Sequence, residues 1–256
     1  MTRRAALLKF FRATGYALVL LFAFCKMGPV SADNAVDLQL VLAVDVSGSV
    51  NERRFELQKQ GYVAAFRDPQ VIRAIRSGPL QAIAVTMTQW TGPALQIQVI
   101  PWTVIRDEAS ANSFADAIEN APRQLFGGGT SISGAIDHGL ALMSEGPYRG
   151  TRRVIDISGD GANNRGRPVT RARDEAVAAG IVINGLPILA IEPDLDRYYD
   201  ESVIGGPGAF VVAARSYETF AGAIRRKLII EIAGNRRQLG ALRQHPLAEG
   251  AGSIHP

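Results

Sequence analysis

Oxygen-bearing side chains gather in three short segments of this 256-residue chain. Asp45, Ser47 and Ser49 alternate with two other residues, Thr130 follows three glycines, and Asp160 lies between two glycines. None of the three segments contains a histidine or a cysteine, and carboxylate and hydroxyl oxygens are ligands of hard cations. The residue types therefore favour a site for Mg²⁺, with Mn²⁺ or Ca²⁺ as alternatives, over a zinc or copper centre.

The alternation in the first segment has a geometric consequence. One turn would direct the hydroxyls of Ser47 and Ser49 toward a single ion while Val46 packs in the opposite direction, and Gly48 permits the tight bend. Mg²⁺ requires a nearly octahedral shell. Three hydroxyls, counting that of Thr130, together with waters leave a position that a carboxylate from another molecule could fill.

Strands and helices alternate along the chain and must position these segments. Residues 37–45 are almost continuously apolar, as in a strand buried on both faces of a parallel sheet, and Asn51 is an N-cap for the helix that follows. Residues 81–90 and 95–100 predict a hairpin, one strand of which should be antiparallel at a sheet edge. Further strands are predicted at 152–158, 181–188 and 209–213, and helices at 51–67, 69–78, 107–120, 131–145, 168–179, 194–202 and 217–233.

This alternation predicts one α/β domain with a doubly wound, mostly parallel sheet and one antiparallel edge strand. In such sheets ligands bind beyond the carboxyl ends of the strands, where the strand order reverses, and the three oxygen-rich segments lie at such ends. Asp156 falls inside a predicted strand. A buried carboxylate requires a partner, for which Arg152 and Arg153 are candidates.

The three segments, in their order along the chain, resemble the metal-ion-dependent adhesion site of the von Willebrand factor type A (VWA) domain. The matching motifs are Asp45-Val-Ser-Gly-Ser49, Gly-Gly-Thr130 and Asp160-Gly161. The resemblance covers about residues 36–234 and implies a VWA-like, Rossmann-like fold over that range. The chain is most similar to a bacterial, exported subgroup of this family with no established function.

The resemblance also implies roles for the individual residues. Ser47, Ser49 and Thr130 would bind the metal directly. Asp45 and Asp160 would bind the metal's waters or contact it from the layer of residues around its direct ligands. The third segment usually reads Thr-Asp-Gly in the family, whereas here a glycine precedes Asp160. The resemblance assigns no role to Asn163 and Asn164, or to the arginines between Arg165 and Arg173.

Residues 1–32 have the three-part composition of a secretory signal peptide. A basic start is followed by an apolar run over residues 13–25 and by small residues that end at Ala32. The run of about 13 residues is short of the ~20 that span a bilayer, so cleavage after Ala32 is predicted. The protein would then be periplasmic or secreted, and the alternative is an uncleaved N-terminal membrane anchor. Residues 235–256 are predicted to form a loose tail.

The formal net charge of +4 depends on the N-terminal segment. Five basic and no acidic residues lie in residues 1–32, which leaves 23 basic and 24 acidic residues in the remainder of the chain. This balance gives no support to nucleic-acid binding.

Two functions from different classes fit these observations. The first is an exported binding module without enzymatic activity, in which an Asp or Glu of a protein partner completes the metal shell. The arginines from Arg165 to Arg173 would then either form a solvated face or attract that acidic partner. The alternative is a Mg²⁺-dependent phosphatase of haloacid-dehalogenase type, because residues 159–164 resemble its Gly-Asp-Gly-x-Asn-Asp motif. Asp45 would be its nucleophile, although Ser47 stands where that family has a second aspartate.

Overall fold

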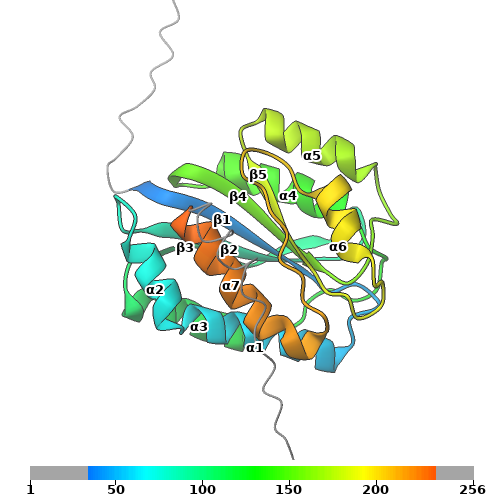
Figure 1. Ribbon diagram of the computed structural model, residues 1–256, viewed down its shortest axis with the longest axis horizontal. Coiled ribbons are helices and arrows are strands. Elements are labelled where there is room, and N and C mark those ends of the chain that lie inside the picture. The colour runs from blue at the N-terminus through cyan, green and yellow to red at the C-terminus, as the bar shows by residue number, and fades with distance from the viewer. Residues whose placement is uncertain (1–33, 235–256) are drawn as a thin grey trace, which may run out of the picture. The chain divides into compact units, whose positions relative to one another are not determined.

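A five-stranded sheet forms the centre of the fold in the computed structural model, which describes residues 34–234 (Figure 1). The strand order is β3-β2-β1-β4-β5, in which β1 pairs in parallel with β2 and β4, and β3 is antiparallel at the edge. The strands are β1 (Ala35–Asp45), β2 (Ile83–Trp90), β3 (Gln96–Ile105), β4 (Arg149–Gly159) and β5 (Val182–Pro187). The predicted fold class is confirmed. The predicted signal peptide (1–32) and tail (235–256) lie outside the described residues.

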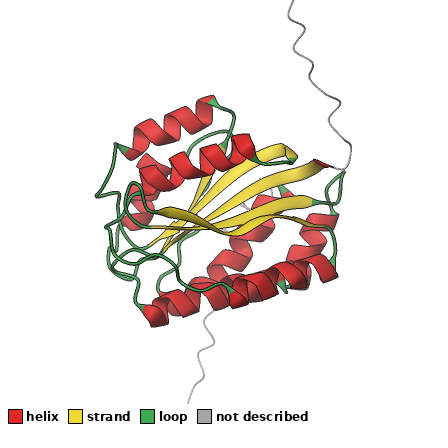
Figure 2. Cartoon of the chain, turned by 180° about the vertical axis from the view of Figure 1, so that it is seen from behind, coloured by secondary structure: helices red, strands yellow, loops and turns green. Residues whose placement is uncertain are grey.

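Helices cover both faces of the sheet, so that the domain has three layers (Figure 2). One layer consists of α1 (Glu52–Phe66), α2 (Pro69–Arg76), α3 (Glu108–Asn120) and α7 (Phe220–Ala233). The other consists of α4 (Ile132–Glu145), α5 (Val169–Ala178) and α6 (Leu195–Tyr198), which continues as a π-helical turn over Tyr199–Val203. A 3₁₀ turn, Tyr217–Thr219, precedes α7. None of the helices within residues 34–234 is both long and apolar enough to cross a membrane.

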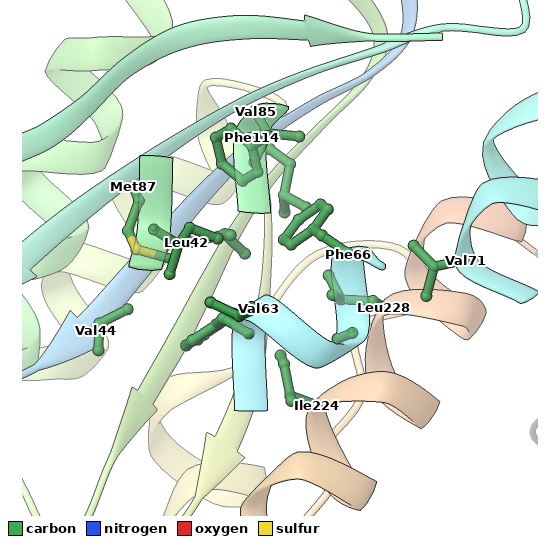
Figure 3. Packing of buried hydrophobic residues seen from close by; sticks show 14 of the residues in the cluster. Leu42, Val44, Val63, Phe66, Val71, Val85, Met87, Phe114, Ile224 and Leu228 are labelled. Carbon is green, nitrogen blue, oxygen red and sulfur yellow. The ribbon is translucent and has the colours of Figure 1, made fainter. Parts of the chain in front are cut away.

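The central strand β1 supplies side chains to two separate hydrophobic clusters. Leu40 and Leu42 point toward α1 and α7, whereas Val41 and Ala43 point toward α4 and α5. Because both faces are buried, the strand is apolar at almost every position rather than at alternate ones. On the α1 side, Phe66 belongs to the larger cluster (Figure 3).

The ends of several elements differ from the sequence prediction. β3 was expected to end at residue 100 but continues to Ile105 through Pro101, which an edge strand tolerates because its outer N–H groups need no partner. The pairing register shifts next to Met87, on the partner strand β2. β4 begins at Arg149 rather than at Arg152.

The prediction of a regular strand at 209–213 is wrong. This segment follows Gly206 and Gly208, both with positive φ. Within the described residues its one isolated bridge joins Val211 to Gly185 of β5, and a second bridge, between Ile188 and Ala214, lies just beyond the ends of both segments. Glycines in the left-handed region make the approach to β5 irregular, so the segment contacts the sheet edge without extending the ladder.

Asp156 has a partner that the sequence did not reveal. Lys227 Nζ on α7 lies 2.6 Å from Asp156 Oδ1 and 3.3 Å from Glu231 Oε1, and all three side chains are buried. Asn184 Nδ2 donates to Glu231 Oε1 at 2.6 Å. Burial raises the pKa of Asp156, and the Lys227 ammonium opposes that rise.

The two arginines expected to pair with Asp156 act elsewhere. Arg152 donates to the carbonyls of Glu231 and Ile232 at the end of α7, and Arg153 donates to the carbonyl of Ala179. Arg152 thus satisfies carbonyl groups that a helix C-terminus leaves without intrahelical partners. The expected pairing of Asp156 with Arg152 or Arg153 is therefore wrong.

We expect Lys227→Met to destabilise the domain by about 3–5 kcal/mol, because it leaves two buried carboxyl groups without their cation. Urea unfolding measures this loss. Arg67→Ala is the control, since Arg67 forms only exposed ion pairs with Asp116 and Glu119 and should cost at most about 1 kcal/mol. Equal losses in the two variants would contradict a structural role for the buried cluster.

Candidate metal centre

The candidate site lies at the carboxyl ends of β1 and β4, where the chain continues to helices on opposite faces of the sheet. β1 lies between β2 and β4, and Val44 is opposite Ser158 in the parallel pairing of β1 with β4. Asp45 and Asp160 therefore emerge side by side at the carboxyl edge of the sheet. From there the chain continues to α1 on one face after β1, and to α5 on the other face after β4. This is the switch point at which doubly wound sheets bind ligands.

Asp45 is the last residue of β1, and it is fully buried. Its Oδ1 accepts a hydrogen bond from Ser47 N at 2.7 Å, which holds the turn, while Oδ2 has no hydrogen-bond partner among the described residues. Burial and the nearby charge of Asp160 raise the pKa of Asp45 to about 7, against the opposing effect of the Ser47 N–H. A side chain at position 159 would collide with Asp45 Oδ2, since a Cβ there would lie 2.9 Å away.

A chain of hydrogen bonds connects the first and third segments. The hydroxyls of Ser47 and Ser49 lie 3.2 Å apart, and Ser49 Oγ donates to Asp160 Oδ1 at 2.6 Å. Ser47 and Asp160 are buried, whereas Ser49 is half-buried. The structure therefore brings Asp160 next to the segment Asp45–Ser49, although more than 100 residues separate the two in the sequence.

Two residues that sequence analysis missed contact Oδ2 of Asp160. Tyr217, just before α7, donates its hydroxyl to Asp160 Oδ2 at 2.8 Å. Arg54 Nη1 lies 3.6 Å from the same oxygen and donates to Ser49 O at 2.7 Å, and the guanidinium stands 5.2 Å over the Tyr217 ring. Burial and the neighbouring Asp160 charge raise the pKa of Tyr217, so the phenol stays protonated as a donor. No local sequence pattern predicts either contact.

Thr130 is positioned by an asparagine from the third segment. Thr130 N donates to Asn164 Oδ1 at 3.0 Å, and Thr130 O accepts from Asn164 N at 2.9 Å and from Arg165 N at 3.1 Å. The three preceding glycines all have positive φ, a backbone path that other residues rarely adopt. A Cβ on Gly161 would lie 3.6 Å from Thr130 Oγ1, so the threonine hydroxyl borders the segment that carries Asp160.

Asn163 has a related structural role at the start of α4. Its Oδ1 accepts from Ser133 N at 2.9 Å, and its Nδ2 donates to Arg167 O at 3.2 Å. Ser131 caps the same helix by accepting from Gly134 N. Asn163 and Asn164 therefore connect the loop after β4 to the start of α4 and to Thr130. Their positions in the sequence did not indicate this role.

These groups fit a hard divalent cation. The three segments converge, an oxygen of the buried Asp45 lacks a partner, and two carboxylates lie close enough to raise the Asp45 pKa. A cation would relieve their repulsion, and hydroxyl and carboxylate oxygens are the donors that Mg²⁺ and Mn²⁺ accept. Within residues 34–234, no cluster of three or more His, Cys, Asp or Glu side chains could hold a metal ion, so a cation at this position would depend on the hydroxyl oxygens as well as on Asp45 and Asp160.

The arginines expected to steer an acidic partner are partly engaged within the domain. Arg167 forms ion pairs with Asp137 and Glu175, at 2.5 and 2.7 Å, and Arg173 pairs with Asp174 at 2.8 Å. Arg167 and Arg173 therefore belong mainly to the α4–α5 surface, which favours the first of the two alternatives, a solvated face, for these two arginines.

The phosphatase alternative gains nothing from this geometry. Asp45, the nucleophile in that hypothesis, is fully buried, and its Oδ1 is engaged by Ser47 N. The side chains of Asn163 and Asn164 bind backbone groups near α4 instead of facing an open cleft. Asn163 and Asn164 thus serve to position the backbone in this fold.

The sheet order and the helices on its two faces give this domain the fold of von Willebrand factor type A domains. The chain belongs to the family described as "Protein of unknown function (DUF1194)", whose model matches residues 35–236. No curated protein sequence matches this chain significantly.

Several solved structures share the fold. Proximal thread matrix protein 1 from the mussel byssus is 16% identical, with a TM-score of 0.55 over 78% of this chain and 48% of that one. A von Willebrand factor type A protein from Catenulispora acidiphila is 16% identical, with a TM-score of 0.54 over 77% and 43%. The pilus adhesin SpaC from Lactobacillus rhamnosus GG is 17% identical, with a TM-score of 0.55 over 78% and 31%. The chain thus spans less than half of each of these proteins.

A further structure of the mussel protein has a zinc-occupied MIDAS motif, the metal-ion-dependent adhesion site of this fold. That structure is 15% identical to this chain, with a TM-score of 0.54 over 78% of this chain and 48% of that one. At these identities the likeness defines the fold.

We expect Asn164→Ala to weaken divalent-cation binding about fivefold, because Thr130 N loses its acceptor and the hydroxyl beside it is less well held. Calorimetric titration with Mn²⁺ measures the change. Asn120→Ala is a matched control, since Asn120 Nδ2 bonds only a carbonyl of its own helix, α3. An affinity that is the same in both variants would contradict the positioning role of Asn164.

Proposed function

We propose that the protein is an exported, divalent-cation-dependent binding module of the adhesion type. Ser47, Ser49 and Thr130 would bind Mg²⁺ directly, and Asp45 and Asp160 would act through water or from behind these ligands. The observation that carries the proposal is the hydrogen bond from Ser49 Oγ to Asp160 Oδ1, which joins the first and third segments at the switch point. The three hydroxyls are neutral, so the ion would keep excess positive charge for an incoming anion.

The anion that suits this position is an Asp or Glu side chain of a protein partner. Tyr217 and Arg54 already contact Oδ2 of Asp160, so part of the site's own negative charge is balanced before a partner arrives. An incoming carboxylate would meet little repulsion, and its loss should cost on the order of 2–5 kcal/mol of binding free energy.

Exposed apolar side chains beside the site support a protein partner over a small free anion. Four large hydrophobic residues are exposed in the described part of the chain, and three of them, Leu95, Phe126 and Ile191, belong to loops that border the site. Leu95 Cδ1 lies within 2.8 Å of where a Cβ on Gly128 would be. Exposed apolar groups around a polar centre are typical of interaction surfaces.

Phe126 is held in place although its side chain is 66% exposed. The Arg123 guanidinium stacks 4.7 Å over its ring, and Arg123 Nη2 also donates to Val46 O at 2.9 Å and to Ser47 O at 3.3 Å. An aromatic ring fixed beside the Ser47 turn offers a partner contact area at low cost in conformational entropy.

The proposed compartment is periplasmic or extracellular, supported by the composition of residues 1–32, with a retained N-terminal anchor as the alternative. The adhesin and the byssus matrix protein that share the fold are compatible with this setting. A binding module fits better than an enzyme because no histidine or lysine stands in any of the three segments as a general base.

We expect Ser47→Ala and Thr130→Ala each to reduce affinity for Mg²⁺ and Mn²⁺ at least about tenfold, because each removes a direct ligand. Circular dichroism should remain unchanged, because little packing depends on either hydroxyl. Ser113→Ala is the control, since its hydroxyl bonds only a carbonyl of its own helix, α3. Unchanged affinity in both site variants would refute the metal site.

The partner chemistry is tested by selecting displayed random peptides on the purified protein in Mg²⁺ and eluting them with a chelator. Every eluted peptide should contain an Asp or Glu that is essential for binding. Its replacement by Asn or Gln should abolish binding, because the carboxylate binds the ion. The Ser47→Ala protein should select none of these peptides. Peptides that bind with full affinity in chelator, or that lack an essential acid, would reject the carboxylate bridge.

A further inference from the structure

Glu192 places a third carboxylate beside the proposed metal site. It belongs to the loop between β5 and α6, where its carbonyl accepts a hydrogen bond from Leu195 N at 3.2 Å. Leu195 is buried in the cluster under α4 and α5, so the backbone at position 192 is anchored to the core. The side chain, in contrast, is exposed.

The carboxylate of Glu192 reaches the third segment next to Thr130. Its two oxygens accept from Ala162 N at 3.2 and 3.3 Å. A Cβ on Gly161 would lie 3.4 Å from Glu192 Oε1 and 3.6 Å from Thr130 Oγ1, so one carbon atom would contact both groups. Gly161 therefore leaves open the space that separates the carboxylate from the threonine hydroxyl.

The hydrogen bonding of Glu192 leaves most of its acceptor capacity unused. Both oxygens share a single N–H at long distances, although a carboxylate can accept about four hydrogen bonds. Among residues 34–234, no basic side chain forms an ion pair with it within 4.0 Å, whereas Asp194 in the same loop lies 3.9 Å from Arg197. Within this range, the carboxylate of Glu192 thus has no cationic partner.

Glu192 borders a hollow at the surface of the domain. The residue lines a hollow of about 450 Å³ together with Ala162, Ile191 and Tyr198. Because the side chain is exposed and borders this hollow, it can change direction without displacing packed groups.

We propose that Glu192 is an internal carboxylate ligand of this site. It reaches the cation on the side of Thr130, directly or through one water, and holds the position that the partner's carboxylate later takes. This inference rests on the proposed function. It has two opposite consequences: Glu192 strengthens cation binding in the free protein, and it weakens partner binding because the partner must displace it.

The test compares Glu192→Gln with Asp194→Asn in the full chain. Glutamine keeps the length of the side chain and an acceptor for Ala162 N, so only the charge is lost. Asp194→Asn removes the same charge from the same loop at a position that forms no contact with the third segment among the described residues. Mn²⁺ serves as the probe, and calorimetry together with water-proton relaxation is the readout.

We expect Glu192→Gln to bind Mn²⁺ about tenfold more weakly, at the lower end of losses for groups next to a metal. Relaxation per bound ion should increase, because a water molecule replaces the carboxylate. Chelator-eluted acidic peptides should bind the loaded variant more tightly than they bind the wild-type protein. Asp194→Asn should match the wild-type protein in all three measurements.

Equal behaviour of Glu192→Gln and Asp194→Asn would overturn the inference. If Ser47→Ala abolishes Mn²⁺ binding while Glu192→Gln does not affect it, the proposed function stands and only the role of Glu192 fails. If Ser47→Ala leaves Mn²⁺ binding unchanged, the proposed metal site fails, and the role of Glu192 fails with it.

Discussion

The parallel pairing of β1 with β4 places two buried carboxylates next to each other, and the rest of the site depends on this constraint. Asp45 and Asp160 are both buried, and the charge of Asp160 raises the pKa of Asp45. The surrounding donors oppose the repulsion between these charges: Ser47 N–H on Asp45, and Ser49 and Tyr217 hydroxyls on Asp160. Each donor satisfies one carboxylate oxygen, and Asp45 Oδ2 has no hydrogen-bond partner in the part of the chain that the structure describes. A divalent cation among the hydroxyls is the simplest group that balances both charges at once.

The two helical layers each contribute to the site, which lies between them. From the α1–α7 side come Arg54 and Tyr217, which hold Asp160. From the α4–α5 side comes the loop after β4, where Asn164 fixes the backbone of Thr130. The sheet supplies the position of the carboxylates, and the layers supply the groups that orient them. Deep in the same domain, Lys227 pairs with Asp156 and so connects α7 to β4.

Local patterns in the sequence predicted the fold, and they also singled out Ser47, Ser49 and Asp160, which hydrogen bonds join in the structure. The continuous apolar run of β1, the edge hairpin and the Asn51 cap depend on neighbours within a few positions, and each is confirmed. The partners of Asp156 and Asp160 are Lys227 and Tyr217, more than 50 residues away, and no periodicity encodes such pairs. The segment at 209–213 has the composition of a strand, but its glycine-rich approach prevents regular pairing. Local propensity describes elements, whereas side-chain pairs form only after the chain has folded.

The central claim is that one cation lies among the hydroxyls of Ser47, Ser49 and Thr130. Anomalous diffraction from crystals grown with Mn²⁺, at a wavelength near its absorption edge, measures the ion's position directly. The account predicts one strong peak at about 2.0–2.3 Å from all three hydroxyl oxygens, with Glu192 turned toward it, distances typical of oxygen ligands on such ions. A site without a peak at saturating Mn²⁺, or a peak bound only by surface carboxylates such as those of α6, would contradict it.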